Sequence, residues 1–114
     1  MVDDEPDQRF LLRRIFERAG HEVTDAGDGA AALRAVRESP PDLVVTDIMM
    51  PVMGGAELIR RLRCEPATAG IPIVAASGHS HLAGDVDAMV PKPYSPRHLL
   101  AVADGLLREG RGLR

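Results

Sequence analysis

The sequence predicts an α/β fold with a doubly wound, five-stranded parallel sheet and helices on both of its faces. Short apolar runs alternate with segments whose apolar residues recur at helical spacing, a pattern typical of parallel strands joined by right-handed crossovers. The run Leu43–Thr46 is rich in β-branched residues, as strands covered on both faces are. The length of 114 residues suits one domain with a core of its own.

Each expected element follows from the same two patterns. Apolar residues at helical spacing predict helices over residues 7–19, 30–38, 56–64 and 96–108. Short apolar runs predict strands over residues 1–2, 21–26, 43–47, 71–76 and 88–90. The first of these strands is very short. Asp28, in a Gly-Asp-Gly turn, can cap the helix predicted over residues 30–38. Residues 78–91 leave little room beside a strand, so any helix there is expected to be shortened.

Composition excludes several classes of protein. The net charge of -3 does not suggest a nucleic-acid-binding surface, so no direct nucleic-acid contact is expected. Cys64 is the only cysteine, which rules out a disulfide within the chain. No apolar run approaches the length of a membrane span, and the first residues are acidic, unlike a signal peptide. A cytoplasmic protein without a membrane partner is expected.

Polar residues follow four of the predicted strands at the point where each ends. They are Asp3 with Asp4, then Asp47, Ser77 and Lys92. Because the carboxyl ends of parallel strands meet at one edge of a doubly wound sheet, these side chains are expected to converge. Taken singly, each has a plainer interpretation: three consecutive acids form a solvated loop, Asp47 caps a turn, and Lys92 is a surface lysine.

Together, these residues suit phosphoryl chemistry. Neighbouring carboxylates repel one another unless a cation neutralises them, and oxygen ligands suit a divalent metal. A metal and the ammonium group of Lys92 would neutralise phosphoryl oxygens, as transfer reactions dominated by positioning require. Asp47 would be the nucleophile, because carboxylates can form aspartyl phosphates. Lys92 is the chain's only lysine, and prolines flank it on both sides.

The motifs and their order resemble the receiver domain of two-component response regulators. The matching pieces are V-D-D-E-P at the start, D-I-M-M-P-V-M-x-G from Asp47, S-G at Ser77, and K-P at Lys92. The thirty-residue step from Asp47 to Ser77 adds to the match. The resemblance covers nearly the whole chain and implies one receiver domain over residues 1–114, with a flavodoxin-like strand order 2-1-3-4-5.

The resemblance also implies a role for each acid. Asp47 is similar to the phosphoacceptor of such domains. Asp4 and Asp47 are similar to side chains that bind Mg²⁺ directly, and Met49 to the residue that offers its backbone carbonyl. Asp3 is similar to the acid that holds water bound to the metal.

The remaining site residues would contact the phosphoryl group. Ser77 matches the switch hydroxyl, and Lys92 matches the lysine that reaches the phosphoryl oxygens. The implied partners are a histidine kinase or phosphotransfer protein and an unidentified downstream protein, and the implied state is a monomer or weak dimer. The implied function is a signalling switch whose chemistry is limited to its own phosphorylation and dephosphorylation.

Three features depart from the family pattern. The first strand, Met1-Val2, is shorter than usual and reads as truncated. An aromatic residue typical of the last strand falls at Met89, and a loop position that is often acidic is Gly54.

Other functions stay open beside the phosphoacceptor. A pseudo-receiver would keep the fold as an interaction module without phosphorylation. A phosphatase of the haloacid dehalogenase type is disfavoured, because the second acid of that family would fall at Met49. His79 and His81 could bind a transition metal, although loop histidines are usually solvated.

Overall fold

The computed structural model describes residues 1–3, 5–47, 54–77, 86–91 and 95–109. Within these ranges the helices are α1 (Pro6–Arg18), α2 (Gly29–Glu38), α3 (Gly55–Cys64) and α4 (Pro96–Glu109). The regular strands there are β1 (Val44–Asp47), β2 (Ile73–Ser77) and β3 (Ala88–Pro91). The shortened helix expected between β2 and β3 falls on residues outside the described ranges.

The sheet is parallel, with β2 between β1 and β3. Val2 extends it by bridging Thr46 of β1 on one side and Ala26 on the other. Reading across the sheet, the order is therefore Ala26, Val2, β1, β2, β3, which corresponds to the predicted order 2-1-3-4-5. The predictions of short strands over residues 1–2 and 21–26 were wrong in extent, because each segment contributes one bridging residue, Val2 and Ala26.

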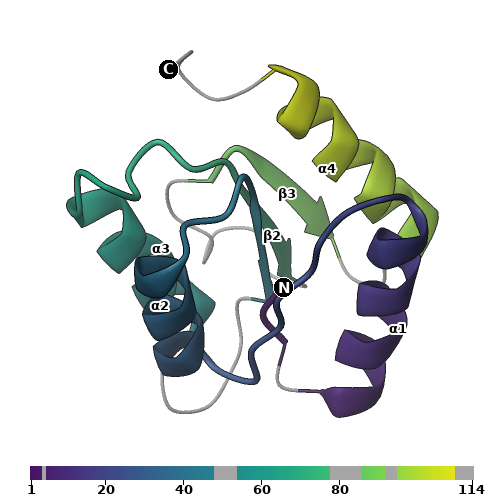
Figure 1. Cartoon of the computed structure of the whole chain (residues 1–114), viewed down its shortest axis with the longest axis horizontal. Helices are drawn as coiled ribbons and strands as arrows, with labels where there is room; N and C mark the ends of the chain where they lie inside the picture. The colour runs from purple at the N-terminus through teal and green to yellow at the C-terminus, as the bar shows by residue number, and fades with distance from the viewer. Residues whose placement is uncertain (4, 48–53, 78–85, 92–94, 110–114) are drawn as a thin grey trace.

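Helices cover both faces of the sheet, with α2 and α3 on one side and α1 and α4 on the other (Figure 1). Because side chains alternate along a strand, Val44 and Ile73 pack toward α2 and α3. Their neighbours Val45 and Val74 pack toward α1 and α4. Met89, where the family pattern has an aromatic residue, is partly buried against the α2 and α3 layer. The two apolar layers hold the strands, and hence their carboxyl ends, in register.

The helix ends follow local sequence signals. Asp28 caps α2, since its carboxylate accepts a hydrogen bond of 2.9 Å from the Ala31 N–H. Gly20 ends the turn after α1 with a positive φ of 98°, a conformation that suits glycine. The His21 N–H reaches back to the Phe16 carbonyl at 3.1 Å, and the His21 ring contacts Asp104 of α4 at 2.8 Å. These contacts fix α1 against α4.

A mostly buried ion pair links α3 to the segments that precede β2 and β3. The Arg63 guanidinium of α3 donates to the carbonyls of Ala69 and Ile71 at 2.9 and 2.7 Å, and to the Asp87 carboxylate at 2.9 Å. Asp87 in turn accepts from the Ile73 N–H at 2.7 Å. Arg63 thus joins α3 to the residues that precede β2 and β3. In the part of the chain that the structure describes, no helix is long and apolar enough to cross a membrane.

Candidate functional site

The strand register places the predicted site residues at one edge of the sheet. Val2 pairs with Thr46, so the next residues of the two segments, Asp3 and Asp47, occupy neighbouring positions at the carboxyl ends. Asp47 also pairs with Ala76, which makes Ser77 the next residue beyond it on β2. Ser77 is in register with Pro91, the last residue of β3.

Asp47 lies at the end of a strand that is buried throughout. Asp47 is only 7% exposed, and its N–H donates to the Val2 carbonyl at 2.9 Å. The hydroxyl of Thr46, itself buried, donates to the Asp47 carbonyl at 2.8 Å. The backbone that presents the Asp47 carboxyl group is therefore held on both sides of its α-carbon. A carboxylate on such a rigid support keeps a constant position, which favours reactions that depend on positioning.

Asp3 is also buried, at 4% exposure, and several hydrogen bonds hold it. Its N–H donates to the Ala26 carbonyl at 3.1 Å. One carboxylate oxygen, Oδ1, accepts from the Glu5 N–H at 2.9 Å, in a turn that leads into α1. The Asp3 carbonyl accepts from Nη1 of Arg9 at 2.8 Å. This acid has little freedom to swing, which suits a positioning role.

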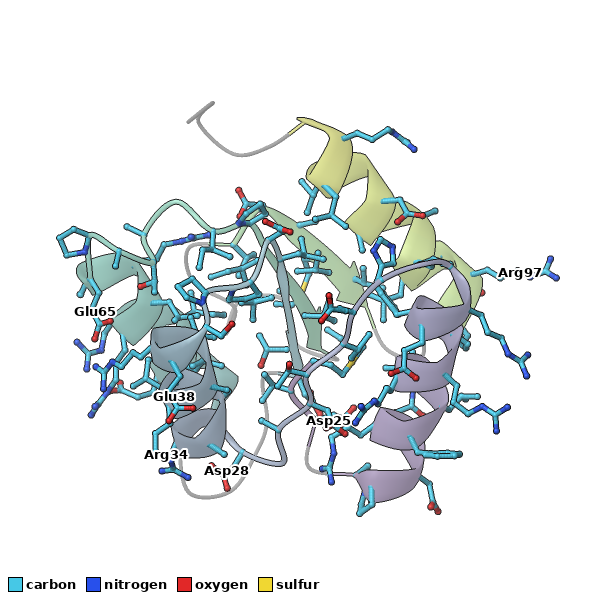
Figure 2. All side chains as sticks on the ribbon, in the orientation of Figure 1. Asp25, Asp28, Arg34, Glu38, Glu65 and Arg97 are labelled. Carbon is cyan, nitrogen blue, oxygen red and sulfur yellow. The ribbon has the colours of Figure 1, made fainter. Side chains whose placement is uncertain are left out.

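Arg9 brings positive charge to the acidic edge of the sheet. Besides contacting Asp3, its guanidinium lies 3.4 Å from the Asp25 carboxylate, which Arg13 also contacts at 3.2 Å. Figure 2 shows Asp25 between the sheet and α1. A Cβ at Gly27 would lie only 3.1 Å from Nη1 of Arg9, so glycine at this position leaves room for the Arg9 side chain. Arg9 was not predicted as a site residue, because its spacing only marks it as a polar position on α1.

Several predicted site residues fall outside the description. Asp4, Met49 and Lys92 lie outside the described residues, as do His79 and His81, and the side chain of Ser77 is not described. Among the residues that are described, no group of three or more histidine, cysteine or acidic side chains forms a metal-binding cluster. Of the predicted metal ligands, Asp3 and Asp47 are described, whereas Asp4 and Met49 are not.

The described part of the edge fits a hard divalent cation. It contributes two buried carboxylates, Asp3 and Asp47, at neighbouring positions of parallel strands. Carboxylate oxygens are the ligands that Mg²⁺ prefers, and it keeps several waters when one or two carboxylates bind it. Burial of two acids side by side is costly without a compensating cation. The donor chemistry of this edge is thus compatible with Mg²⁺.

Fold and edge geometry together define a small parallel α/β domain with acids at the carboxyl ends of its central strands. The sequence profile described as "Response regulator receiver domain" matches residues 1–104. The chain therefore belongs to the response regulator receiver domain family. This assigns it to signal transduction by two-component systems and agrees with the resemblance seen in the sequence.

Individual relatives show the same kinship in different contexts. The DNA-binding response regulator MtrA of Mycolicibacterium smegmatis is 36% identical over 115 residues, covering 95% of this chain and 49% of the relative. The sensor histidine kinase TmoS of Ectopseudomonas mendocina is 35% identical over 114 residues, covering 94% of this chain and 12% of the relative. The chain thus spans about half the length of MtrA.

Solved structures agree with the fold. The signal receiver domain of a signal transduction histidine kinase from Syntrophus aciditrophicus superposes with a TM-score of 0.91 and 28% identity, covering 99% of this chain and 91% of that one. The same fold thus occurs in a domain that belongs to a histidine kinase. The predicted α/β fold class and family are confirmed.

Proposed function

We propose that this receiver domain accepts one phosphoryl group on Asp47 from a histidine kinase or phosphotransfer protein, in a reaction that depends on Mg²⁺. The observation that carries the proposal is the placement of Asp47, buried at the carboxyl end of β1, beside Asp3 and one step from Ser77. Membership of the receiver family supports it.

Asp47 is the proposed nucleophile. One of its carboxylate oxygens forms a bond to phosphorus while the bond from phosphorus to the donor's nitrogen breaks, and the donor nitrogen takes up a proton. When bound, Mg²⁺ supplies positive charge that balances the phosphoryl oxygens. The hydrogen bonds around the backbone of Asp47 support the role, because they hold the acceptor in one place.

The other site residues have supporting roles. Asp4, Asp47 and the Met49 carbonyl would hold Mg²⁺, and Asp3 would hold water beside the ion. The hydrogen bonds that restrain Asp3 support a fixed outer acid better than a group that moves. Ser77 and Lys92 would contact the phosphoryl oxygens, Ser77 from the end of β2 and Lys92 from the position after β3.

The result of phosphorylation would be a signal to a downstream protein, not turnover of a substrate. The names of the relatives include a DNA-binding regulator and a sensor kinase, so either context fits a domain of this family. The expectation that this domain does not itself bind nucleic acid stays a prediction, as does the monomeric or weakly dimeric state.

Intact mass spectrometry tests the proposal. Incubated with Mg²⁺ and acetyl phosphate, the protein should gain one phosphoryl group, and Asp47→Asn should gain none. Asp42→Asn is the matched control, because Asp42 is exposed and lies two residues before the amino-terminal end of β1, away from the predicted site. It should be labelled like the wild type.

Equal labelling of Asp47→Asn and the wild type would refute the acceptor assignment. Absence of labelling in every variant, with Mg²⁺ present and the fold intact, would favour the pseudo-receiver function. Asp4→Ala adds a test of the metal site, since it should weaken Mg²⁺ binding and prevent labelling without lowering the melting temperature in metal-free buffer.

A further inference from the structure

Arg9, near the start of α1, closes a ring of contacts that begins and ends at the backbone of Asp3. Its Nη1 donates to the Asp3 carbonyl at 2.8 Å, and its Nε lies 3.4 Å from the Asp25 carboxylate. Asp25 is joined directly to Ala26, whose carbonyl accepts a hydrogen bond of 3.1 Å from the Asp3 N–H. Both backbone polar groups of Asp3 are therefore held within one closed set of contacts.

The contact from Arg9 acts on the peptide group between two acids of the predicted metal site. The Asp3 carbonyl belongs to the planar unit that joins Asp3 to Asp4. A hydrogen bond from a guanidinium is charge-assisted and roughly twice as strong as one between neutral groups. Rotation of the peptide group would break this bond, so the bond restrains the backbone that carries both acids.

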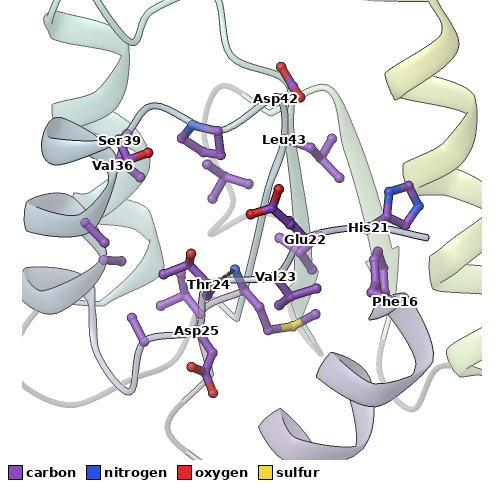
Figure 3. A pocket seen from close by; sticks show the side chains of 18 of the residues that line it. Phe16, His21, Glu22, Val23, Thr24, Asp25, Val36, Ser39, Asp42 and Leu43 are labelled. Carbon is purple, nitrogen blue, oxygen red and sulfur yellow. Dashed lines mark hydrogen bonds between the residues drawn. The ribbon is translucent and has the colours of Figure 1, made fainter. Parts of the chain in front are cut away.

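Asp25 holds the Arg9 side chain in place and offsets its charge. Figure 3, which looks into the cleft beside the segment 20–26, shows the Asp25 side chain pointing away from Asp42 and Leu43. The Arg9 and Asp25 side chains are 24% and 29% exposed, so water and salt screen their attraction less than at the open surface. Because an unbalanced cation would repel Mg²⁺, this carboxylate lets Arg9 lie at the acidic edge without opposing the metal.

We propose that Arg9 is a positioning residue for the metal site. It fixes the peptide group between Asp3 and Asp4, and Asp25 in turn fixes Arg9. The inference rests on the proposed Mg²⁺-dependent function and adds two residues to it that touch neither the metal nor the phosphoryl group. A guanidinium suits this role because it is planar and presents donors to two acceptors at a fixed angle.

Titration of the metal-free protein with Mg²⁺, followed by calorimetry, measures the contribution of Arg9. Arg9→Met keeps an apolar stem and removes the guanidinium, so it should raise the dissociation constant of Mg²⁺ about tenfold, at the lower end for groups that orient metal ligands.

Arg13→Met is the matched control on the same helix. Arg13 contacts Asp25 at 3.2 Å and Glu17 at 3.1 Å, so its removal also takes a cation from Asp25 but breaks no printed contact with Asp3. Its dissociation constant for Mg²⁺ should stay close to that of the wild type.

Two further variants separate position from charge. Arg9→Lys keeps the charge, but its single ammonium cannot hold both acceptors at the angles of a guanidinium, so it should bind Mg²⁺ as weakly as Arg9→Met. Asp25→Asn should also weaken Mg²⁺ binding, because Arg9 loses its support. Combined with Arg9→Met, it should add no further loss, since both substitutions break the same ring.

Amide exchange in the absence of metal gives an independent readout. The Glu5 N–H donates to Oδ1 of Asp3 at 2.9 Å and thus reports on the order of this acid. Its exchange, followed by NMR, should be faster in Arg9→Met than in Arg13→Met. Melting temperatures of both variants in metal-free buffer should show that both remain folded.

Several outcomes would overturn the proposal. Wild-type Mg²⁺ affinity in Arg9→Met, while Asp47→Asn still abolishes labelling, would remove the positioning role and leave the proposed function intact. Wild-type affinity in Arg9→Lys would mean that the charge alone matters, and tighter binding in Arg9→Met would mean that Arg9 repels the ion. A wild-type protein that binds no Mg²⁺ would remove the proposed function and this inference together.

Discussion

At the scale of single residues, Arg63 holds together parts that are distant in sequence. Its side chain is 10% exposed and its partner Asp87 15%, so the pair is mostly out of water. It also satisfies two carbonyls of the turn that enters β2. Arg61, on the same helix, bonds Glu57 at the surface instead. The two arginines allow a direct comparison of a buried and an exposed ion pair.

Arg63→Ala should lower the free energy of unfolding by about 3 kcal/mol or more, because it removes a cation that pairs with the mostly buried Asp87 carboxylate. Arg61→Ala should stay close to the wild type, since exposed pairs contribute little. Urea denaturation of the two variants measures the difference. An equal loss of unfolding free energy in both variants would mean that the Arg63 contacts stabilise the fold no more than the exposed Arg61 pair does.

Arg9 and Arg63 also show what residue patterns leave out. The sequence marks them as polar positions on helices, while their partners lie in other elements: Asp3 and Asp25 for Arg9, and Asp87 for Arg63. Helical spacing encodes which face is polar but not which distant group that face meets. Asp47 and Asp3, by contrast, were predicted at a shared edge because strand ends have a position that topology dictates.

At the scale of elements, most helices and strands form where local signals place them. Asp28 was predicted as the cap of the following helix and does cap α2. The segment 21–26 has the composition of a strand, yet only Ala26 pairs, with Val2 as its partner. A strand needs a partner along its length, and here Met1 and Val2 supply only the inner end. Composition alone therefore could not predict the outcome for this segment.

Removal of the α2 cap gives a prediction at this scale. Asp28→Ala should lower the free energy of unfolding by about 1 kcal/mol, because the Ala31 N–H loses its acceptor. Asp28→Ser should retain most of the stability, since serine is also a good cap. Thermal or urea unfolding measures both, and a serine variant as unstable as the alanine variant would exclude capping as the cause.

At the scale of the whole molecule, the Met1 amino group couples folding to pH. Burial lowers the pKa of the Met1 amino group from 8.0 to about 6, and the negative charge of Asp25 offsets part of this effect. Between pH 6 and pH 8 the unfolded chain then binds more protons than the folded one. Stability should therefore rise with pH across this window.

Urea unfolding at several values of pH between 6 and 8 tests this coupling for the chain with a free Met1 amino group. Acetylation of that group is the control, because it removes the titration of Met1 and leaves the nearby His21 unchanged. The acetylated protein should lose the rise that is due to Met1. An identical pH dependence in both forms would assign the effect to other groups.

The two edges of the sheet have different roles. The carboxyl edge gathers acids at positions that the order of strands predicts, and the receiver family membership of the chain agrees with that arrangement. The amino edge holds a cleft between segments 20–26 and 38–45, beside the first strand that the sequence predicts to be very short. Both edges depend on the central position of Val2 and β1.

The most direct test of the central claim is chemical mapping of the acceptor. After incubation with Mg²⁺ and acetyl phosphate, borohydride reduces an aspartyl phosphate to homoserine, which tandem mass spectrometry locates in the sequence. We predict homoserine at position 47 and at no other aspartate, with none formed when Mg²⁺ is chelated beforehand. Homoserine at Asp3, Asp42 or another acid in place of position 47 would contradict the account.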